Sequence, residues 1–168
     1  LYDLEQLQQH ARHLVASLPA NCEMFYAIKA NSDLPILQTL ASEVHCFEVA
    51  SGGELDWVRK HFPSVPVIFG GPGKTDAELQ AGLSHGVEYL HIESLGELER
   101  LAWITEQKQS TVDVLLRMNL SLKDMPQTTL SMGGRPTPFG IDAKQLPQVL
   151  VWLKQHQQIR LCGFHFHL

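Results

Sequence analysis

The chain has 168 residues, of which 44% are hydrophobic, and its formal net charge at pH 7 is -5. A chain of this length and composition can bury a core, so we expect a globular domain and not a disordered segment. It has neither a lysine and arginine cluster nor an apolar run of the ~20 residues that span a bilayer, so nucleic acid and membranes are poor partners and a small molecule is expected.

The cysteines point to a reducing compartment. Cys22, Cys46 and Cys162 each lie in an apolar stretch, lack the spacing of a metal or redox motif, and are odd in number. The polar start of the chain does not resemble a secretory signal. We therefore expect reduced core thiols and a cytoplasmic protein.

Helical and strand-like patterns alternate along the chain. After a lead-in helix at 3–18, which Pro19 ends, short β-rich runs alternate with amphipathic stretches. The strands are expected at 23–28, 44–49, 65–69, 87–92, 112–119 and 159–168, and the helices between them at 34–41, 54–61, 76–83, 95–106 and 146–156. The pairs Ser51/Glu54, Thr75/Glu78 and Ser94/Glu97 fit the capping box that starts a helix.

Strict alternation with short connections predicts parallel strands, in either a doubly wound sheet or a (β/α)8 TIM barrel. Six strands in 168 residues extrapolate to eight in roughly 230 to 250, the usual length of a barrel. The chain also lacks an initiator methionine and stops inside a strand-like run. We therefore expect residues 1–168 to be one truncated domain, about six βα units of a TIM barrel.

Lys29 is the most unusual residue of the first strand-like run. Alternation places it on the same face as Phe25 and Ala27, and a helix is expected to start at Asn31-Ser32-Asp33 just beyond it. Burial and the positive end of that helix both favour the neutral amine, which is a nucleophile. The alternative is a lysine that reaches water or pairs with a carboxylate.

The segment Tyr26-Ala27-Ile28-Lys29-Ala30-Asn31 resembles the cofactor-lysine motif of fold-type III pyridoxal-phosphate enzymes, which include alanine racemase and the ornithine and diaminopimelate decarboxylases. The resemblance covers nearly the whole chain. It continues through Phe47-Glu48-Val49-Ala50-Ser51-Gly52-Gly53-Glu54-Leu55, Ile68-Phe69-Gly70-Gly71-Pro72-Gly73-Lys74, Glu93-Ser94-Leu95-Gly96-Glu97-Leu98, Leu116-Arg117-Met118-Asn119, Phe139-Gly140-Ile141 and Gly163-Phe164-His165-Phe166-His167. The Ser-Gly-Gly-Glu-Leu and Gly-Pro-Gly-Lys segments are similar to the decarboxylase branch, which favours decarboxylation over racemisation.

The resemblance implies pyridoxal 5'-phosphate as cofactor, bound to Lys29 as an aldimine, and an amino acid that loses its carboxylate as CO2. It implies that His167 lies against the cofactor ring, although a strand histidine is often structural. Glu48 and Glu54 match acidic positions near the cofactor lysine, although Glu54 also fits a helix cap. Arg117 matches an arginine near the active centre and could pair with Glu48, with an anion, or in a rim salt bridge.

The long segment from Leu120 to Gly140 is expected to cover the catalytic mouth, because loops of this length usually serve function. Pro138 stands where many relatives carry lysine, and Met132-Gly133-Gly134-Arg135-Pro136 resembles decarboxylases of siderophore and related pathways. Diaminopimelate, ornithine, lysine and a siderophore precursor all stay open as substrates.

The family resemblance also implies what lies beyond Leu168: the phosphate loop, the acid that pairs with the pyridine nitrogen, and a C-terminal β-domain. We expect the chain alone to be inactive and the whole protein to be a homodimer. Two alternatives stay open. One is a metal-dependent barrel hydrolase built on His165 and His167, which lie on one face of a strand. The other is a non-catalytic barrel that only binds pyridoxal phosphate.

Overall fold

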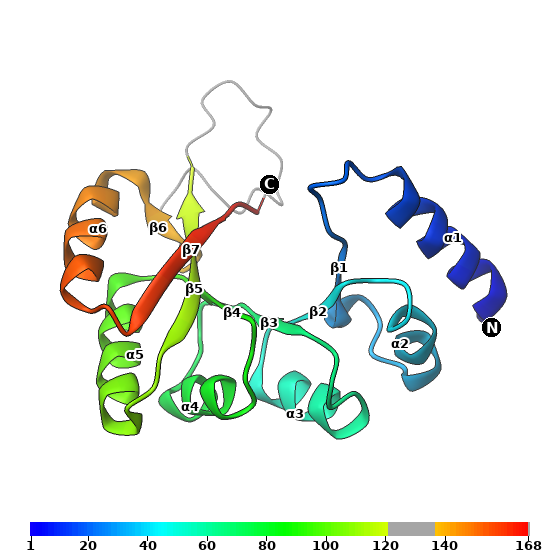
Figure 1. The fold of residues 1–168 in the computed structure, drawn as a ribbon, viewed down its shortest axis with the longest axis horizontal. Helices are drawn as coiled ribbons and strands as arrows, with labels where there is room; N and C mark the ends of the chain where they lie inside the picture. The colour runs from blue at the N-terminus through cyan, green and yellow to red at the C-terminus, as the bar shows by residue number, and fades with distance from the viewer. Residues whose placement is uncertain (121–136, 168) are drawn as a thin grey trace. The chain divides into compact units, whose positions relative to one another are not determined.

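The computed structural model describes residues 1–120 and 137–167 (Figure 1). The chain divides into two compact units, Leu1–Phe69 and Gly70–Leu168, which are described separately below. In the described residues, no helix is both long and apolar enough to cross a membrane.

The first unit contains three parallel strands and the helices that connect them. Helix α1 (Leu4–Ser17) is capped by Asp3, whose carboxylate accepts a hydrogen bond from the Gln6 backbone N–H at 3.0 Å. The remaining elements are β1 (Phe25–Ala27), the 3₁₀ turn η1 (Ile28–Ala30), α2 (Leu34–Leu40), β2 (Cys46–Val49), α3 (Gly52–His61) and β3 (Val67–Phe69). Strand β2 pairs with β1 on one side and with β3 on the other.

The two faces of these strands differ in chemistry. Phe47 is fully buried and packs edge-on against Phe62, the residue that ends α3, with ring centroids 5.5 Å apart. The opposite face carries Ala27, Glu48 and Ile68, which are level with one another in the parallel register. A carboxylate on an otherwise apolar row therefore lies on the face away from α3.

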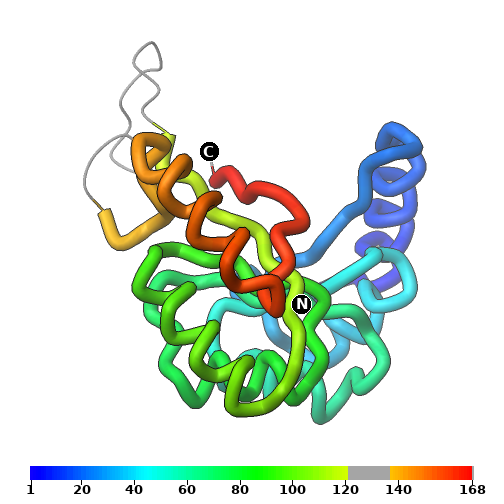
Figure 2. The backbone as a smooth tube through the Cα atoms, turned by 60° about the vertical axis from the view of Figure 1, so that its left-hand side comes forward, coloured from blue at the N-terminus to red at the C-terminus, as the bar shows by residue number. Residues whose placement is uncertain are grey.

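The second unit is built around β5 (Val112–Asn119), which pairs in parallel with β4 (Tyr89–Ile92), with β6 (Ile141–Asp142) and with β7 (Ile159–His165). Its helices are α4 (Asp76–Ser84), α5 (Leu95–Lys108) and α6 (Leu146–Gln155), and a 3₁₀ turn, η2 (Ala143–Gln145), leads into α6. Strand β7, red in Figures 1 and 2, runs alongside the yellow-green β5.

Register determines which side chains of this unit share a face. His91, Leu115 and Gly163 are level with one another, and Arg117 is level with His165. Because residues two apart on a strand point the same way, Arg117 and His165 lie on the same face as His91. The other face of β4 and β5 carries buried Leu90, Ile92, Val114 and Leu116.

Three helices of the chain start as their hydroxyl residues predict. Ser51, Thr75 and Ser94 accept hydrogen bonds from the backbone N–H groups of Glu54, Glu78 and Glu97. Only Glu78 returns the bond to its own cap residue, at 2.8 Å. Glu54 and Glu97 accept instead from the residue before the cap, so each ties its helix to the end of the preceding strand.

The structure confirms the predicted parallel α/β architecture, and each expected helix and strand is present with small shifts at its ends. The sequence did not predict η1 or the two-residue β6, and β7 ends at His165. The expectation for the Leu120–Gly140 segment, including the Met132 to Pro136 stretch, falls mainly on 121–136, outside the described residues. Of the cysteines, only Cys46 is buried, so the prediction of core thiols is wrong for Cys22 and Cys162.

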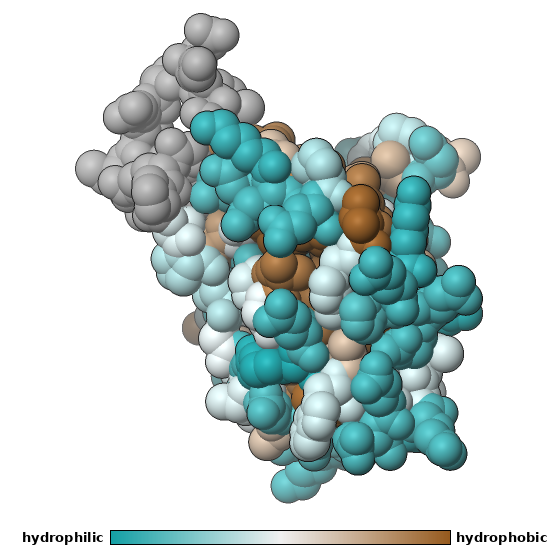
Figure 3. Space-filling model, turned by 90° about the vertical axis from the view of Figure 1, so that its left-hand side faces the viewer, coloured by the Kyte–Doolittle hydropathy of each residue, from teal (hydrophilic) through white to brown (hydrophobic). Residues whose placement is uncertain are grey.

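The outer surface of the second unit suits a layer of helices that faces water. Figure 3 shows the side of Figure 1 on which α5 and α6 lie, and hydrophilic residues cover most of the visible surface. Trp103 of α5 and Val151 of α6 are exposed apolar residues, and scattered residues of this kind are ordinary on protein surfaces.

Candidate active site

Lys29 lies just beyond the carboxyl end of β1, in the 3₁₀ turn η1, and its side chain is exposed. The prediction that Lys29 is buried on a strand face is therefore wrong. Strand β1 ends at Ala27, so the alternation of the strand does not extend to Lys29. The structure instead presents a primary amine that a ligand can reach at the carboxyl end of a parallel strand.

The backbone around Lys29 is held by side chains from other parts of the first unit. The Tyr26 hydroxyl donates to the Asn31 carbonyl at 3.2 Å, and the Trp57 indole N–H donates to the Ser32 carbonyl at 3.3 Å. Asn31 also accepts from the Asp33 N–H at 2.9 Å, which closes the turn before α2. The amine thus sits on a fixed backbone, which suits a residue that must meet a ligand in one geometry.

The two glutamates predicted near Lys29 have different surroundings. Glu48 is half-buried in β2, level with Ala27 and therefore close to the strand end that carries Lys29. The Glu54 carboxylate accepts a hydrogen bond from the Ala50 N–H at 2.6 Å and so serves the start of α3. In residues 1–120 and 137–167, no hydrogen bond or ion pair joins Lys29 to either glutamate.

Arg117 forms a buried ion pair with Glu93, with 3.0 Å between Nη1 and Oε1. In the described residues the partner of Arg117 is Glu93 and not Glu48, whereas the pairing of Arg117 with an anion stays a prediction. Glu93 directly follows β4, and Ile92 is level with Leu116, so register places Glu93 beside Arg117. The Arg117 guanidinium also lies 4.7 Å from the centre of the Phe139 ring.

A second ion pair, between Lys74 and Glu97, is connected to the first. The two groups are 2.9 Å apart and almost fully buried, and Lys74 also donates to the Gly71 and His91 carbonyls at 2.7 Å. Glu97 accepts the backbone N–H of Glu93 at 2.8 Å. Lys74 and Glu97 are thus both engaged in contacts within the second unit, and these contacts join the Gly71–Lys74 loop to the end of β4 and the start of α5.

The sequence reasoning did not assign a role to Glu93 or Lys74. Both stand inside the motifs that carry the family resemblance, and Glu93 directly follows a buried apolar strand. The charge of Glu93 directly after an apolar strand was the sequence feature that could have marked it as a candidate site residue. Their partners could not be identified, because pairing depends on strand register and on the loop that follows β3.

Gly140 lies against the backbone at the end of β5. Its N–H donates to Glu93 Oε2 at 3.0 Å, its φ is 81°, and a Cβ there would lie 3.0 Å from the Asn119 nitrogen and 3.1 Å from the Arg117 oxygen. A side chain would meet main-chain atoms that cannot easily move.

We expect Gly140→Ala to lower the free energy of unfolding by about 2 kcal/mol or more, measured by urea denaturation. Gly96→Ala is the matched control, because in the described residues a Cβ there meets no atom within 4 Å apart from its chain neighbours and the backbone of its own helix. The control should change stability by less than about 1 kcal/mol. Equal effects at the two positions would contradict the steric argument.

His91 is buried in β4, and its ring packs against that of His165 with centroids 4.2 Å apart. Neither ring nitrogen of His91 has a hydrogen-bond partner in the described part of the chain. Burial first, and then the neighbouring His165, Lys74 and Arg117, lower the pKa of His91 from 6.5 to about 3. The ring is therefore neutral at physiological pH.

This lowered pKa predicts a pH dependence of stability. The unfolded chain gains a proton near pH 6.5, whereas the folded chain does not until about pH 3, so stability falls as the pH drops through that window. From pH 7 to 5 the wild type should lose about 2 kcal/mol more than His91→Asn, which lacks this group. Urea denaturation across that range measures the difference, and parallel pH profiles would contradict the assignment.

His167 lies two residues beyond the end of β7 and is exposed. Its ring is 6.3 Å from that of His165, in an edge-to-face arrangement. His165 therefore lies between His91 and His167 in a row of imidazoles. Contact of His167 with a cofactor ring, and metal binding by His165 and His167, both stay predictions.

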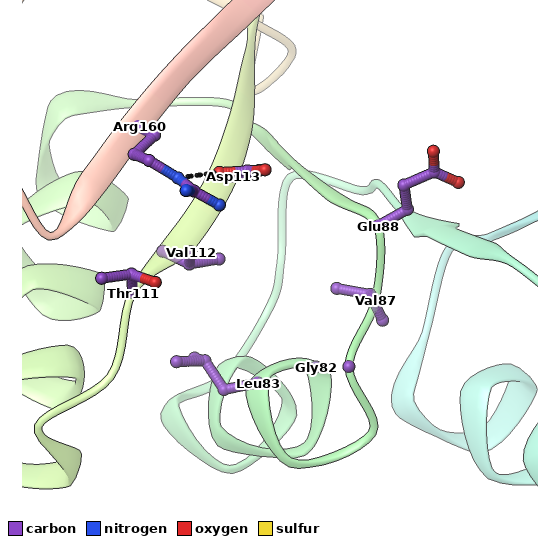
Figure 4. Close-up of a pocket in the computed structure, with 9 residues that line it drawn as sticks. Gly82, Leu83, Val87, Glu88, Thr111, Val112, Asp113 and Arg160 are labelled. Carbon is purple, nitrogen blue, oxygen red and sulfur yellow. Dashed lines mark hydrogen bonds and ion pairs between the residues drawn. The ribbon is translucent and has the colours of Figure 1, made fainter.

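A small cavity in the second unit lies at the amino ends of β4, β5 and β7, the opposite end from Arg117 and His165 (Figure 4). Its lining includes Val87, Glu88 and Val112, as well as the ion pair of Asp113 with Arg160. Its volume of about 140 Å³ is well below the roughly 300 Å³ at which ligand pockets usually begin. We assign it no cofactor role.

Residues 4–168 match the family of the pyridoxal-dependent decarboxylases, in its pyridoxal-binding domain. A Staphylococcus aureus relative, 2-[(L-alanin-3-ylcarbamoyl)methyl]-2-hydroxybutanedioate decarboxylase, is 47% identical over 99% of this chain and 42% of its own length. The diaminopimelate decarboxylase of Bacteroides thetaiotaomicron is 28% identical over 92% of this chain and 40% of its own.

The structure of Helicobacter pylori diaminopimelate decarboxylase complexed with L-lysine is also similar. It aligns with a TM-score of 0.86 and 26% identity, over 99% of this chain and 43% of that chain. The chain thus spans about two fifths of the length of the proteins it matches. These matches do not support a hydrolase.

Proposed function

This chain belongs to the pyridoxal-dependent decarboxylases, as their pyridoxal-binding domain, and from this premise we propose that the whole protein removes CO2 from an amino acid. Pyridoxal phosphate is the cofactor of the family. The observation that carries the proposal is the exposed amine of Lys29, fixed at the carboxyl end of β1, where parallel βα folds place their reactive groups.

The residues of the structure fit the cofactor. A primary amine that can condense with an aldehyde must be accessible, and Lys29 is. In the described residues neither ring nitrogen of His91 has a hydrogen-bond partner, so a polar group of a ligand could bind there. We propose that Lys29 holds the cofactor, that His167 covers its ring, and that Glu48, Glu54 and Arg117 complete this side of the site.

Bound pyridoxal phosphate supplies an acceptor for the electron pair that the departing carboxylate leaves behind. The side chains of the protein position charged groups around the cofactor. The Lys29 amine would hold the cofactor at this strand end. The Glu93 carboxylate keeps the Arg117 guanidinium in one position, at 3.0 Å, so that its charge faces the site without side-chain reorganisation. Glu54 fixes the strand end from which α3 starts.

The substrate that we propose is an amino acid carrying additional carboxylates, like the compound in the name of the Staphylococcus aureus relative. The 47% identity to that enzyme, against 28% to a diaminopimelate decarboxylase, supports this choice. We further propose that residues 1–168 belong to one barrel domain and that the whole protein has a second domain and acts as a cytoplasmic homodimer. The greater length of the relatives supports the second domain.

Decarboxylation by the whole protein tests the proposal. CO2 release is measured with 2-[(L-alanin-3-ylcarbamoyl)methyl]-2-hydroxybutanedioate, diaminopimelate, ornithine and lysine, with and without pyridoxal phosphate. We expect the first compound to give the highest kcat/KM and the reaction to require the cofactor. Cofactor binding without CO2 release from any compound would instead support a non-catalytic binding protein.

A further inference from the structure

His91 is a buried polar residue whose ring nitrogens have no hydrogen-bond partner in the described part of the protein. Its side chain is 3% exposed, and in the described ranges neither Nδ1 nor Nε2 has a hydrogen-bond partner. Buried polar atoms are nearly always paired, because leaving one unpaired loses the hydrogen bonds that water would make. Two such atoms on one ring indicate that another molecule supplies the partner.

The position of His91 indicates which molecule that is. His91 shares a strand face with Arg117 and His165, at the carboxyl ends of β4, β5 and β7. The level of His91 on β7 is occupied by Gly163, which has no side chain; a Cβ there would lie 3.3 Å from Leu115. Parallel βα folds bind ligands at the carboxyl ends of their strands. At this end His91 therefore presents ring nitrogens that can form hydrogen bonds with a ligand.

The contacts of the ring leave its edge for this purpose. His165 packs against the ring with 36° between the planes, which covers a face of His91, whereas the ring nitrogens lie in its plane. Lys74 is engaged with the His91 backbone carbonyl and with Glu97, and Arg117 is engaged with Glu93. Burial, and then His165 and these two cations, lower the pKa of His91 to about 3, so the ring offers one donor and one acceptor at neutral pH.

We propose that His91 is a further cofactor-binding residue, whose neutral imidazole hydrogen-bonds an oxygen atom of bound pyridoxal phosphate. The inference rests on the proposed function, because it takes pyridoxal phosphate as the ligand of this strand end. The phenol and phosphate groups of pyridoxal phosphate keep their oxygen atoms when the aldehyde is joined to a lysine, so a neutral imidazole can donate to one of these oxygens without adding a charge. His165 acts as a positioning residue that holds the His91 ring in place.

Replacement of His91 by phenylalanine separates a ligand-binding role from a structural one. Phenylalanine keeps a flat ring against His165 but has no nitrogen, so a structural role predicts equal or higher stability and unchanged cofactor affinity. The proposed role predicts that His91→Phe in the whole protein raises the Kd for pyridoxal phosphate about tenfold or more, while the apo protein keeps its Tm. His91→Asn, which keeps a donor and an acceptor, should bind within about threefold of wild type.

The Kd is read from the visible absorbance gained when pyridoxal phosphate is added to the apo protein. His61→Phe is the matched control, because His61 also has a buried ring nitrogen without a partner and packs on an aromatic ring, that of Trp57 at 4.1 Å. It should bind like wild type. If His91→Phe does not fold, His91→Met is read in the same way.

The outcomes separate this inference from the proposed function. A wild-type Kd in a folded His91→Phe or His91→Met protein would overturn the role of His91 and leave the proposed function intact. Failure of the wild-type protein itself to gain visible absorbance would overturn both.

Discussion

Replacing Lys29 by alanine in the whole protein is expected to lower kcat by a factor on the order of 10³ or more, because the variant has lost the amine that we propose holds the cofactor. Lys29 lies on an exposed turn whose backbone is held by Tyr26 and Trp57, so the substitution should not disturb the fold. CO2 release at saturating substrate and pyridoxal phosphate measures the effect.

Lys108→Ala provides the matched control for this prediction. Lys108 is an exposed lysine in the last turn of α5, and no role in the site is assigned to it. It should retain wild-type kcat and Tm. A Lys29→Ala protein with kcat within about tenfold of wild type would show that the reaction does not depend on this amine.

The largest stability effect is expected at the buried pair of Arg117 and Glu93. The two side chains are 9% and 1% exposed, so removing the cation leaves a buried carboxylate without its partner. Arg117→Met should lower the free energy of unfolding by about 3 to 5 kcal/mol, measured by urea denaturation. The effect should be far larger than that of Arg160→Met, whose pair with Asp113 is well exposed at the arginine.

The pair also allows a rescue test. Adding Glu93→Gln to Arg117→Met removes the remaining buried charge, while the amide oxygen can still accept from the Gly140 N–H. The double variant should therefore recover a substantial part of the lost stability. Equal destabilisation in the single and double variants would mean that the ionic pairing is not what stabilises these strand ends.

The order of helices and strands could be predicted because their signals are local. Period-two apolar runs and hydroxyl residues at helix starts mark elements such as β5 and α5 without knowledge of the rest of the chain. Strand β6 could not be predicted, because two residues carry no period, and it forms only where Met118 and Asn119 of β5 offer a partner.

The candidate site residues could be named from motifs, but their environments could not be predicted. Lys29 was expected on a buried strand face, yet β1 stops two residues earlier and a turn exposes the side chain. For Arg117, pairing with Glu48, with an anion or in a rim salt bridge was left open, and register brings the guanidinium to Glu93. The sequence did not single out His91, because a histidine inside an apolar strand is often structural. Its distinguishing feature is structural: both ring nitrogens lack hydrogen-bond partners in the described residues.

The covalent position of the cofactor tests the account most directly. The whole protein is loaded with pyridoxal phosphate, reduced with borohydride to make the lysine linkage permanent, digested, and mapped by mass spectrometry. The account predicts the added mass of the reduced cofactor on Lys29. A label on a different lysine, such as Lys74, or no label on a protein that releases CO2, would contradict it.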